Sequence, residues 1–559
     1  MLSEVNNTRV VRVLALLASL AACALFYLPT IGGGFLSDDY SVLGALDAWA
    51  GEHRLIAALL AKFGEGLDSP SHYYRPLAML SFGVNYALSG VSPLSWRLTN
   101  LAVHLCSTAL VFAIATRLGE PARARPPIVA PTLAAVVFAA FPTNVEAVAW
   151  VSGRYDLLAL AFMLATVACF QRSQRWNDGW GIAALAAAVC AFSSKESAAL
   201  LPALVLVVAI GRRWPAGAGK ALEEGVRDAA PWLALGVAYF VLRAAIFGTP
   251  FRVFPGPSPL EALLSGDWVK PLASGNAWLE AAMPSPLPRT AFLAAIAVLV
   301  AMGALASLRS LPIRGAWLAI AVATTLSIVL LLPHVANLLP SGEHARLLYT
   351  TSALLALLVA LPWRAWTYRK GSRIWRGSMI VATAALVASE AALLRAAIAP
   401  WVEAGNEATM LIAALPRVAQ TIPTSGYGLV LVPAYLSNVP FGHNAQGGLI
   451  TSPVQREPLS QRLVVQTPLD LPPWPGHMAR GLVDALRRYP LTDVLTAVEQ
   501  GRAVGGVAPT HYFCWAAGAR QLVPLSWSAE LAARDWLAAW RSALAASPCD
   551  ASARELATP

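Results

Sequence analysis

The chain has 559 residues, of which 57% are apolar and 13% are charged, and its mean hydropathy is +0.57. This balance excludes an ordinary soluble globular protein and indicates a polytopic membrane protein. The formal net charge of +10 does not indicate nucleic acid as a partner. The Lys and Arg residues lie in short clusters between apolar runs, where membrane orientation explains them.

Apolar runs of about 20 residues recur along the chain, and each is long enough for a helix to cross the ~30 Å of hydrocarbon. The first run lacks a small-x-small cleavage site and is longer than a typical signal core, so we interpret it as a retained helix. The sequence predicts eleven spans, at 11–31, 97–117, 128–147, 155–171, 180–194, 197–211, 231–248, 290–308, 315–333, 346–362 and 377–398.

Basic residues predict the orientation of these spans. Segments such as "RLGEPARAR" and "GRRWPAGAGK" are rich in Arg, and the positive-inside rule places them, with the N-terminus, in the cytoplasm. A long first loop at 32–96 and everything after residue 400 then lie outside. The Ala-rich and Arg-rich composition is typical of a high-GC bacterium, so we expect a multi-pass inner-membrane protein with its C-terminal part in the periplasm.

The segment 400–559 differs in kind from the membrane region, 1–399. Short β-like runs such as "GLVLVPAYL" and "QRLVVQT" and many Pro and Gly residues predict a small α/β or α+β domain. Cys514 and Cys549 lie there, where an oxidising compartment would allow a disulfide, although two unpaired thiols are the alternative. The other four cysteines lie in predicted helices and are expected to pack as small apolar residues.

Polar residues gather at the predicted external ends of the helices, where membrane proteins place functional sites. Each also has a structural interpretation: Arg as an interface anchor, Lys195 and Glu196 neutralising each other, His104 as an interior histidine, and the acidic pair capping a helix. The cluster comprises Asp38, Asp39, Tyr74, Arg75, His104, Glu146, Arg154, Asp156, Lys195, Glu196, Glu343, His344 and Arg346.

A carboxylate near several cations suits the transfer of a group away from a phosphate. The carboxylate accepts the proton of an incoming hydroxyl, and the cations stabilise the charge that grows on the leaving phosphate. Asp38 and Asp39 could instead hold a divalent cation through their oxygens, so a divalent cation is the possible cofactor.

Five motifs carry a resemblance to a known family: "SDDY", "YYRPLAMLSFGVNYALSGVSPLSWRLTNLAVH", "FPTNVEAVAWVSGRYDLLALAF", "SSKESAALLP" and "EHARLLYTTSALLA". Over about residues 30–360 they resemble the GT-C membrane glycosyltransferases. The likeness is greatest to the transmembrane O-mannosyltransferases that act on cadherins and to their bacterial relatives, which are similar to protein O-mannosyltransferases. The chain lacks the tetratricopeptide repeats of the eukaryotic members.

The resemblance implies a GT-C fold of about eleven helices and a polyprenyl-phosphate-linked sugar donor used on the extracytoplasmic face. It implies that Asp38 or Asp39 is the base, without choosing between them, and that Arg346, with Arg154 and Lys195, contacts the donor phosphate. The remaining polar residues would line the cavity: Glu146, Glu196, Arg75, Tyr74, His104 and His344.

We therefore predict a glycosyltransferase that performs an inverting single displacement onto a hydroxyl of a glycan, lipid or protein. The alternatives are a transporter or flippase for lipid-linked sugars and a non-catalytic protein that binds them. A transporter would show internal repeats and polar groups on both sides of the membrane. The polar cluster here is one-sided.

Overall fold

The computed structural model is mostly helical and divides into two compact units, each described separately below. The first unit comprises Met1–Pro29, Leu59–Ser81 and Arg97–Ile398, and the second comprises Thr30–Ala58, Phe82–Trp96 and Ala399–Pro559. The structure describes residues 2–51, 73–118, 128–250, 279–280, 282–331, 344–366, 373–424, 426, 428–433, 435–442, 445, 447–466, 511–525 and 542.

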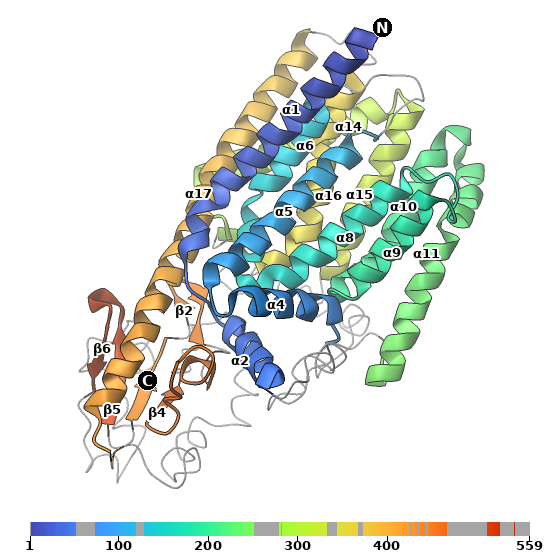
Figure 1. Ribbon diagram of the computed structural model, residues 1–559. Coiled ribbons are helices and arrows are strands. Elements are labelled where there is room, and N and C mark those ends of the chain that lie inside the picture. The colour runs from blue at the N-terminus through green and yellow to red at the C-terminus, as the bar shows by residue number, and fades with distance from the viewer. Residues whose placement is uncertain are drawn as a thin grey trace. The chain divides into compact units, whose positions relative to one another are not determined.

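Long apolar helices build the first unit (Figure 1). Three helices, α4, α5 and α17, run from one unit into the other. The bounds of the long helices are α1 Leu2–Tyr27, α5 Pro93–Ala115, α6 Val129–Ala140, α8 Arg154–Phe170, α9 Gly179–Phe192, α10 Leu201–Arg213, α11 Ala218–Phe247, α14 Pro286–Ser307, α15 Leu311–Leu331, α16 Tyr349–Trp366 and α17 Arg373–Thr421.

In the described residues, nine helices are long and apolar enough to cross a membrane, or ten if one bent pair counts as a span. The bent pair is Val129–Ala140 with Pro142–Ala149, and the helix Gly179–Phe192 is a shorter apolar one. These eleven features correspond one to one with the eleven predicted spans. The predicted count is higher because apolar composition does not reveal the 50° bend, and because it includes the short run at 180–194, which is the short helix α9 in the structure.

The bend between α6 and α7 (Val145–Ala149) has a local cause. Pro142 restricts the residue before it, and Phe141 accordingly takes an extended conformation with φ −59° and ψ 121°. A second turn leads from α7 into α8 at Gly153, where a Cβ atom would lie 2.4 Å from the carbonyl oxygen of Ala147. Only glycine fits there, so these two turns place the start of α8 beside α7.

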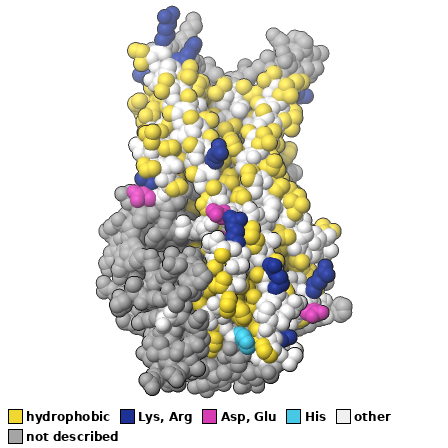
Figure 2. Space-filling model, turned by 90° about the vertical axis from the view of Figure 1, so that its left-hand side faces the viewer, with side chains coloured by type: hydrophobic (Ala, Val, Ile, Leu, Met, Phe, Trp, Pro, Cys, Tyr) yellow, Lys and Arg dark blue, Asp and Glu magenta, His cyan; other side chains and the backbone are white. Residues whose placement is uncertain are grey.

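Side-chain exposure in the first unit fits a lipid environment. Leu14, Leu25, Val237 and Val241 are each more than half exposed, at 59%, 69%, 64% and 63%. Figure 2 shows one face of the molecule, where hydrophobic side chains dominate the described helices and Lys and Arg are sparse. Large apolar groups would be costly in water over so wide a surface but are favourable against lipid.

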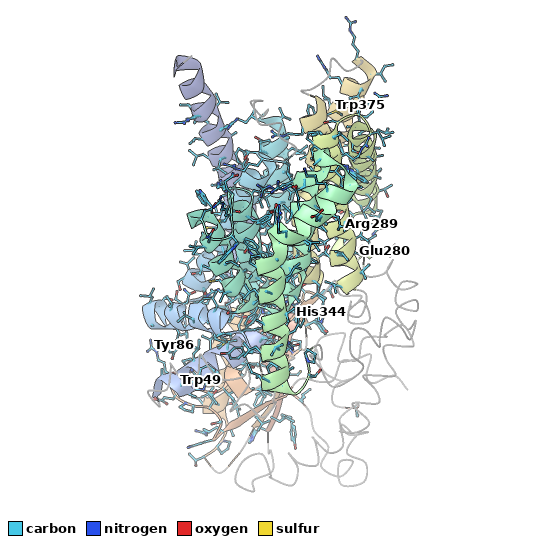
Figure 3. All side chains as sticks on the ribbon, turned by 90° about the vertical axis from the view of Figure 1, so that its right-hand side faces the viewer. Trp49, Tyr86, Glu280, Arg289, His344 and Trp375 are labelled. Atoms are coloured by element: carbon cyan, nitrogen blue, oxygen red, sulfur yellow. The ribbon has the colours of Figure 1, made fainter. Side chains whose placement is uncertain are left out.

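The interior of the first unit is held by pairwise helix packing. Helix α16 packs against α6, α14 and α15, α10 packs against α11 and α15, α8 packs against α9, and α1 packs against α6. Before α14, Glu280 forms an ion pair of 3.4 Å with Arg289 of the first turn (Figure 3).

The second unit contains α2 (Asp38–Gly51), the end of α4 (Pro76–Ser89) and a small mixed sheet. The strand order is β4-β1-β5-β6, with β1 parallel to β4 and β5, and β5 antiparallel to β6. The first run predicted as β-like contains β1 and β2 and the second contains β4, so that prediction is confirmed. The strand bounds are β1 Gly428–Leu431, β2 Tyr435–Leu436, β3 Val439–Pro440, β4 Leu463–Gln466, β5 His511–Ala516 and β6 Gln521–Pro524.

Candidate functional site

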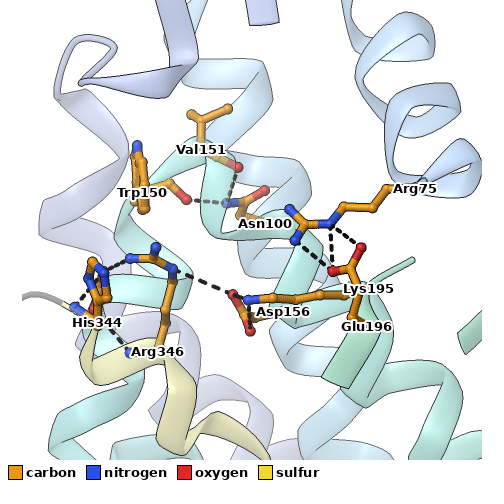
Figure 4. A network of polar contacts seen from close by, with 10 residues as sticks. Arg75, Asn100, Trp150, Val151, Asp156, Lys195, Glu196, His344 and Arg346 are labelled. Carbon is orange, nitrogen blue, oxygen red and sulfur yellow. Dashed lines mark hydrogen bonds and ion pairs between the residues drawn. The ribbon is translucent and has the colours of Figure 1, made fainter. Parts of the chain in front are cut away.

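Charged side chains of the first unit converge at the N-terminal end of α8 (Figure 4). They come from the segment before α4, from α7, from the first turn of α8, from Lys195 and the start of the short helix η4 (Glu196–Leu200) after α9, from the last turns of α11, and from η7 (Ala345–Leu348). All of these segments are the ends of apolar helices, so charge is concentrated where the helices leave the apolar layer. We refer to Arg75, Glu146, Asp156, Lys195, Glu196, Arg243 and Arg346 as the charged cluster.

Asp156 is the centre of one half of the charged cluster. Its two carboxylate oxygens accept hydrogen bonds from Lys195 Nζ at 2.6 and 2.7 Å, and Arg346 Nε lies 3.8 Å from Oδ2. Asp156 is 6% exposed. Burial lowers the pKa of Lys195 below its ordinary value, although Asp156 opposes the shift.

Glu146 holds the segment that carries Arg346. Its carboxylate accepts hydrogen bonds from the backbone N–H of His344 at 3.2 Å and of Arg346 at 3.0 Å, and it forms an ion pair with the Arg346 guanidinium. His344 has φ 72°, in the left-handed region that is costly for residues other than glycine. The guanidinium of Arg346 also lies over the ring of Trp150, 4.6 Å from its centroid. Glu146 thus positions both the backbone and the side chain of Arg346.

Glu196 lies between two arginines in the other half of the charged cluster. Arg75 donates to it from Nε at 3.0 Å and from Nη2 at 2.7 Å, and Arg243 Nη1 lies 3.8 Å from Oε1. The Arg75 guanidinium also lies over the rings of Tyr73 and Tyr155 at 4.0 and 4.7 Å. Burial alone lowers the pKa of Arg75, but the carboxylate of Glu196 outweighs it, so the pKa is raised.

Two of the predicted residues lie in the interior of the unit. Arg154 is fully buried and donates to the Asn100 side chain at 2.8 Å and to the carbonyl oxygen and hydroxyl of Ser81 at 3.3 Å. His104 is also fully buried, and its Nδ1 lies 2.7 Å from the hydroxyl of Tyr349. The half-buried Tyr74 adjoins Arg75 in the chain.

Asp38 and Asp39 belong to the second unit, where both lie in the first turn of α2. Asp39 is 1% exposed, and its Oδ2 accepts a hydrogen bond from the backbone N–H of Leu36 at 2.9 Å. Asp38 is half-buried. This hydrogen bond of Asp39 therefore does not cap a free N–H of the helix; it fixes the chain just before the helix.

Two members of the charged cluster had no predicted role: Asp156 was in the predicted polar cluster without a role, and Arg243 was not in it. Asp156 stands two residues after Arg154 in the motif "SGRYD", and only the pairing in space distinguishes it from an ordinary helix-start carboxylate. Arg243 stands within a predicted span. An arginine inside an apolar run is itself a signal of function, so the sequence held a clue to Arg243.

Of the two cysteines in the predicted disulfide, only Cys514 lies in the described part of the chain. Cys514 on β5 is disulfide-bonded, whereas Cys549 lies outside the described residues. Cys23, Cys106, Cys169 and Cys190 are free thiols; Cys23 is buried, Cys169 and Cys190 are partly buried, and Cys106 is exposed. In the described part of the chain, no group of three or more His, Cys, Asp or Glu side chains is arranged to hold a metal ion.

Sequence comparison matches about a third of the chain to known proteins, while no family model matches it. A stretch of 191 residues, 33% of the chain, is 36% identical to the protein O-mannosyl-transferase Tmtc1 of Drosophila melanogaster, of which it covers 21%. Its relatives are protein O-mannosyl-transferases. Tmtc2 of the same fly is 36% identical over 28% of this chain and 17% of its own length, and human TMTC2 is 29% identical over 32% and 22%. The resemblance predicted from the motifs is confirmed, over about a fifth of the relatives' length.

Two solved structures have a similar fold at low similarity. ArnT from Cupriavidus metallidurans bound to undecaprenyl phosphate is 14% identical, with 90% of this chain and 92% of that chain covered and a TM-score of 0.43. The archaeal oligosaccharyltransferase AglB from Archaeoglobus fulgidus, in complex with an inhibitory peptide and a dolichol-phosphate, is 12% identical over 75% and 62%, with a TM-score of 0.41. Likeness at this level carries no functional assignment.

Proposed function

We propose that the chain is a GT-C membrane glycosyltransferase that transfers a sugar from a polyprenyl-phosphate-linked donor to an acceptor hydroxyl. The charged cluster is the observation that carries this proposal. Its four cations, Arg75, Lys195, Arg243 and Arg346, exceed its three carboxylates by one charge. A lipid-linked sugar phosphodiester carries one negative charge, so the cluster and the donor are complementary.

Two further observations support the proposal. The sequence relatives are protein O-mannosyl-transferases, which are enzymes of this chemical class. The disulfide at Cys514 in the second unit favours an oxidising compartment, as the periplasm is, for the part of the chain after residue 400. With the Arg-rich segments on the opposite side, this orientation puts the N-terminus of a bacterial inner-membrane protein in the cytoplasm.

The proposed reaction is a single displacement. The acceptor oxygen attacks the anomeric carbon as the bond from that carbon to the phosphate oxygen breaks. The acceptor proton passes to an aspartate, and polyprenyl phosphate leaves with one more negative charge than the donor had. Arg346 and Lys195 are the proposed phosphate ligands, since a guanidinium donates in a bidentate manner and an ammonium adds a compact charge.

Between the two aspartates, we propose Asp38 as the base. Asp39 is 1% exposed and uses Oδ2 to bind the N–H of Leu36, whereas Asp38 is more exposed. A base must exchange its proton with substrate and water, which favours the more exposed carboxylate. Asp39 then has a positioning role.

Arg154 was predicted as a third phosphate ligand, and we now propose a positioning role for it. Its guanidinium is fully buried and binds Asn100, whose side chain in turn donates to the carbonyl oxygens of Trp150 and Val151 at 2.8 and 3.2 Å. Trp150 carries the ring beneath Arg346. Through Asn100, Arg154 therefore stabilises the turn at Trp150, whose ring contacts the guanidinium of the proposed phosphate ligand Arg346.

Undecaprenyl phosphate tests the proposal without knowledge of the sugar, because it is the carrier common to such donors. Native mass spectrometry of the purified chain should show tighter binding of undecaprenyl phosphate than of undecaprenol, and Arg346→Gln should weaken the former about 100-fold while leaving the latter unchanged. The matched control is Arg213→Gln, which removes a more exposed arginine paired with Glu224 and Asp228. Equal affinity for undecaprenol and undecaprenyl phosphate would contradict the proposal.

Turnover is tested separately from binding. Incubation with lipid-linked sugars extracted from bacterial membranes should release undecaprenyl phosphate, detected by mass spectrometry, and the release should require an acceptor hydroxyl. Binding of the carrier without release from any fraction would favour the non-catalytic binding protein instead.

A further inference from the structure

Three arginines gather at the end of α8 that is opposite to the charged cluster. Arg117 follows α5, Arg172 follows α8, and Arg212 lies in the last turn of α10. Helix α8 has 17 residues, which separates its two ends by about 25 Å at ~1.5 Å per residue. We refer to Arg117, Arg172 and Arg212 as the arginine patch, and it is distinct from the proposed sugar-donor site.

Two of the three guanidiniums are fixed in position by the C-terminus of α8. Arg172 Nη1 donates to the carbonyl oxygen of Ala168 at 2.8 Å, and Arg212 donates to those of Phe170 and Ser173 at 2.9 and 3.5 Å. The last carbonyls of a helix carry partial negative charge and attract cations. These contacts orient the two guanidiniums. The partial negative charge of the helix end does not neutralise their two full positive charges.

Among the described residues, no carboxylate forms an ion pair with Arg117, Arg172 or Arg212. The α11 carboxylates Glu224 and Asp228 pair with Arg213, and Asp228 also acts electrostatically on Arg212 without an ion pair. Asp178, the nearest carboxylate along the chain from Arg172, accepts hydrogen bonds from the backbone N–H of Gln174, Arg175 and Gly181. Arg117 meanwhile acts electrostatically on both Arg172 and Arg212.

The patch borders a lipid-facing surface. Trp176 and Trp180, which follow Arg172 in the chain, are 56% and 50% exposed, and the Arg172 guanidinium lies 5.2 Å from the ring centroid of Trp180. On α9, Ile182 and Val189 are 57% and 50% exposed. Exposed Trp beside exposed aliphatic side chains is typical of the level at which lipid headgroups lie.

We propose that the arginine patch binds the phosphate of an anionic phospholipid from the leaflet around it. Three arginines from three helix ends offer several donors to one phosphate, and the neighbouring apolar surface of α9 is suited to the acyl chains. The bound lipid would join the ends of α5, α8 and α10 by neutralising charges that otherwise repel one another.

The test uses native mass spectrometry of the full chain in detergent, with phosphatidylglycerol as the probe and phosphatidylcholine as the zwitterionic comparison. Phosphatidylglycerol should bind more tightly, and Arg117→Gln/Arg212→Gln should weaken it about 25-fold, or about 5-fold per arginine. The control Arg227→Gln/Arg309→Gln removes two exposed arginines outside the patch and should leave the affinity unchanged.

A single variant and a competition experiment with inorganic phosphate complete the test of the arginine patch. If the double variant fails to fold, Arg117→Gln alone carries the test, because this exposed side chain makes no hydrogen bond within the described residues. Inorganic phosphate at millimolar concentration should not displace the lipid. Equal affinity in patch and control variants, equal binding of the two lipids, or displacement by free phosphate would each overturn the proposal.

Discussion

Lys195 and Asp156 form a buried ion pair in which the ammonium nitrogen contacts both carboxylate oxygens, at 2.6 and 2.7 Å. The two side chains are only 13% and 7% exposed. An ion pair in such a position is costly to break on one side, because the remaining charge stays buried without compensation. This pair, the Glu146 segment and the acidic pair of α2 lead to four predictions.

Asp156→Asn should destabilise the protein by about 3 kcal/mol, since it leaves the Lys195 ammonium without its counter-charge. The measurement is thermal unfolding in detergent. Asp228→Asn is the control, because its pair with Arg213 is more exposed and such pairs contribute less than about 1 kcal/mol. A shift no larger than that of the control would mean that the pair does not hold these helix ends together.

Glu146→Gln should lower kcat/KM for sugar transfer by about 100-fold, because the 344–346 segment would lose its carboxylate anchor and misplace Arg346. The effect should fall mainly on kcat, and Glu146→Asp should recover part of the activity. Glu224→Gln, which removes a carboxylate bound to the exposed Arg213, is the control. Full activity in Glu146→Gln would show that the backbone holds its conformation unaided.

Lys195→Arg should extend donor binding to more alkaline pH. Lys195 is an ammonium below its pKa and neutral above it, and burial lowers that pKa below the ordinary value. As pH rises, the affinity of the unmodified protein for undecaprenyl phosphate should therefore begin to fall at a lower pH than it would if Lys195 had the ordinary pKa of a lysine. An arginine stays charged throughout this range. If the affinity for undecaprenyl phosphate fell over the same alkaline pH range in both proteins, Lys195 would not be a phosphate ligand.

Asp38→Asn should abolish transfer, by at least about 100-fold, without changing the melting temperature. Asp39→Ala should instead destabilise the protein by about 1–3 kcal/mol, because the buried N–H of Leu36 loses its acceptor. Activity and thermal unfolding are measured on Asp38→Asn, Asp39→Ala and Asp39→Asn. Loss of transfer in Asp39→Asn with Asp38→Asn fully active would reverse the assignment.

Sequence reasoning named most of the charged residues that lie together at the N-terminal end of α8, but not how their charges pair. Lys195 and Glu196 are neighbours, and mutual neutralisation was a reasonable alternative from the sequence. In the structure they bind different partners: Lys195 binds Asp156 and Glu196 binds Arg75. The reason is local, because Lys195 has an extended backbone, with φ −161° and ψ 153°, and successive side chains then point to opposite sides.

The sequence by itself determined the number and position of the apolar segments, the two strands of the sheet that it named and the end of the membrane region at which polar residues collect. Those features follow from composition and periodicity, which are local along the chain. Only the tertiary structure decided that Glu146 holds the turn of Arg346 across 200 residues, that Arg243 joins Glu196, and that Arg154 is an interior support. Pairing of this kind depends on which helix ends pack together, and no local pattern encodes that.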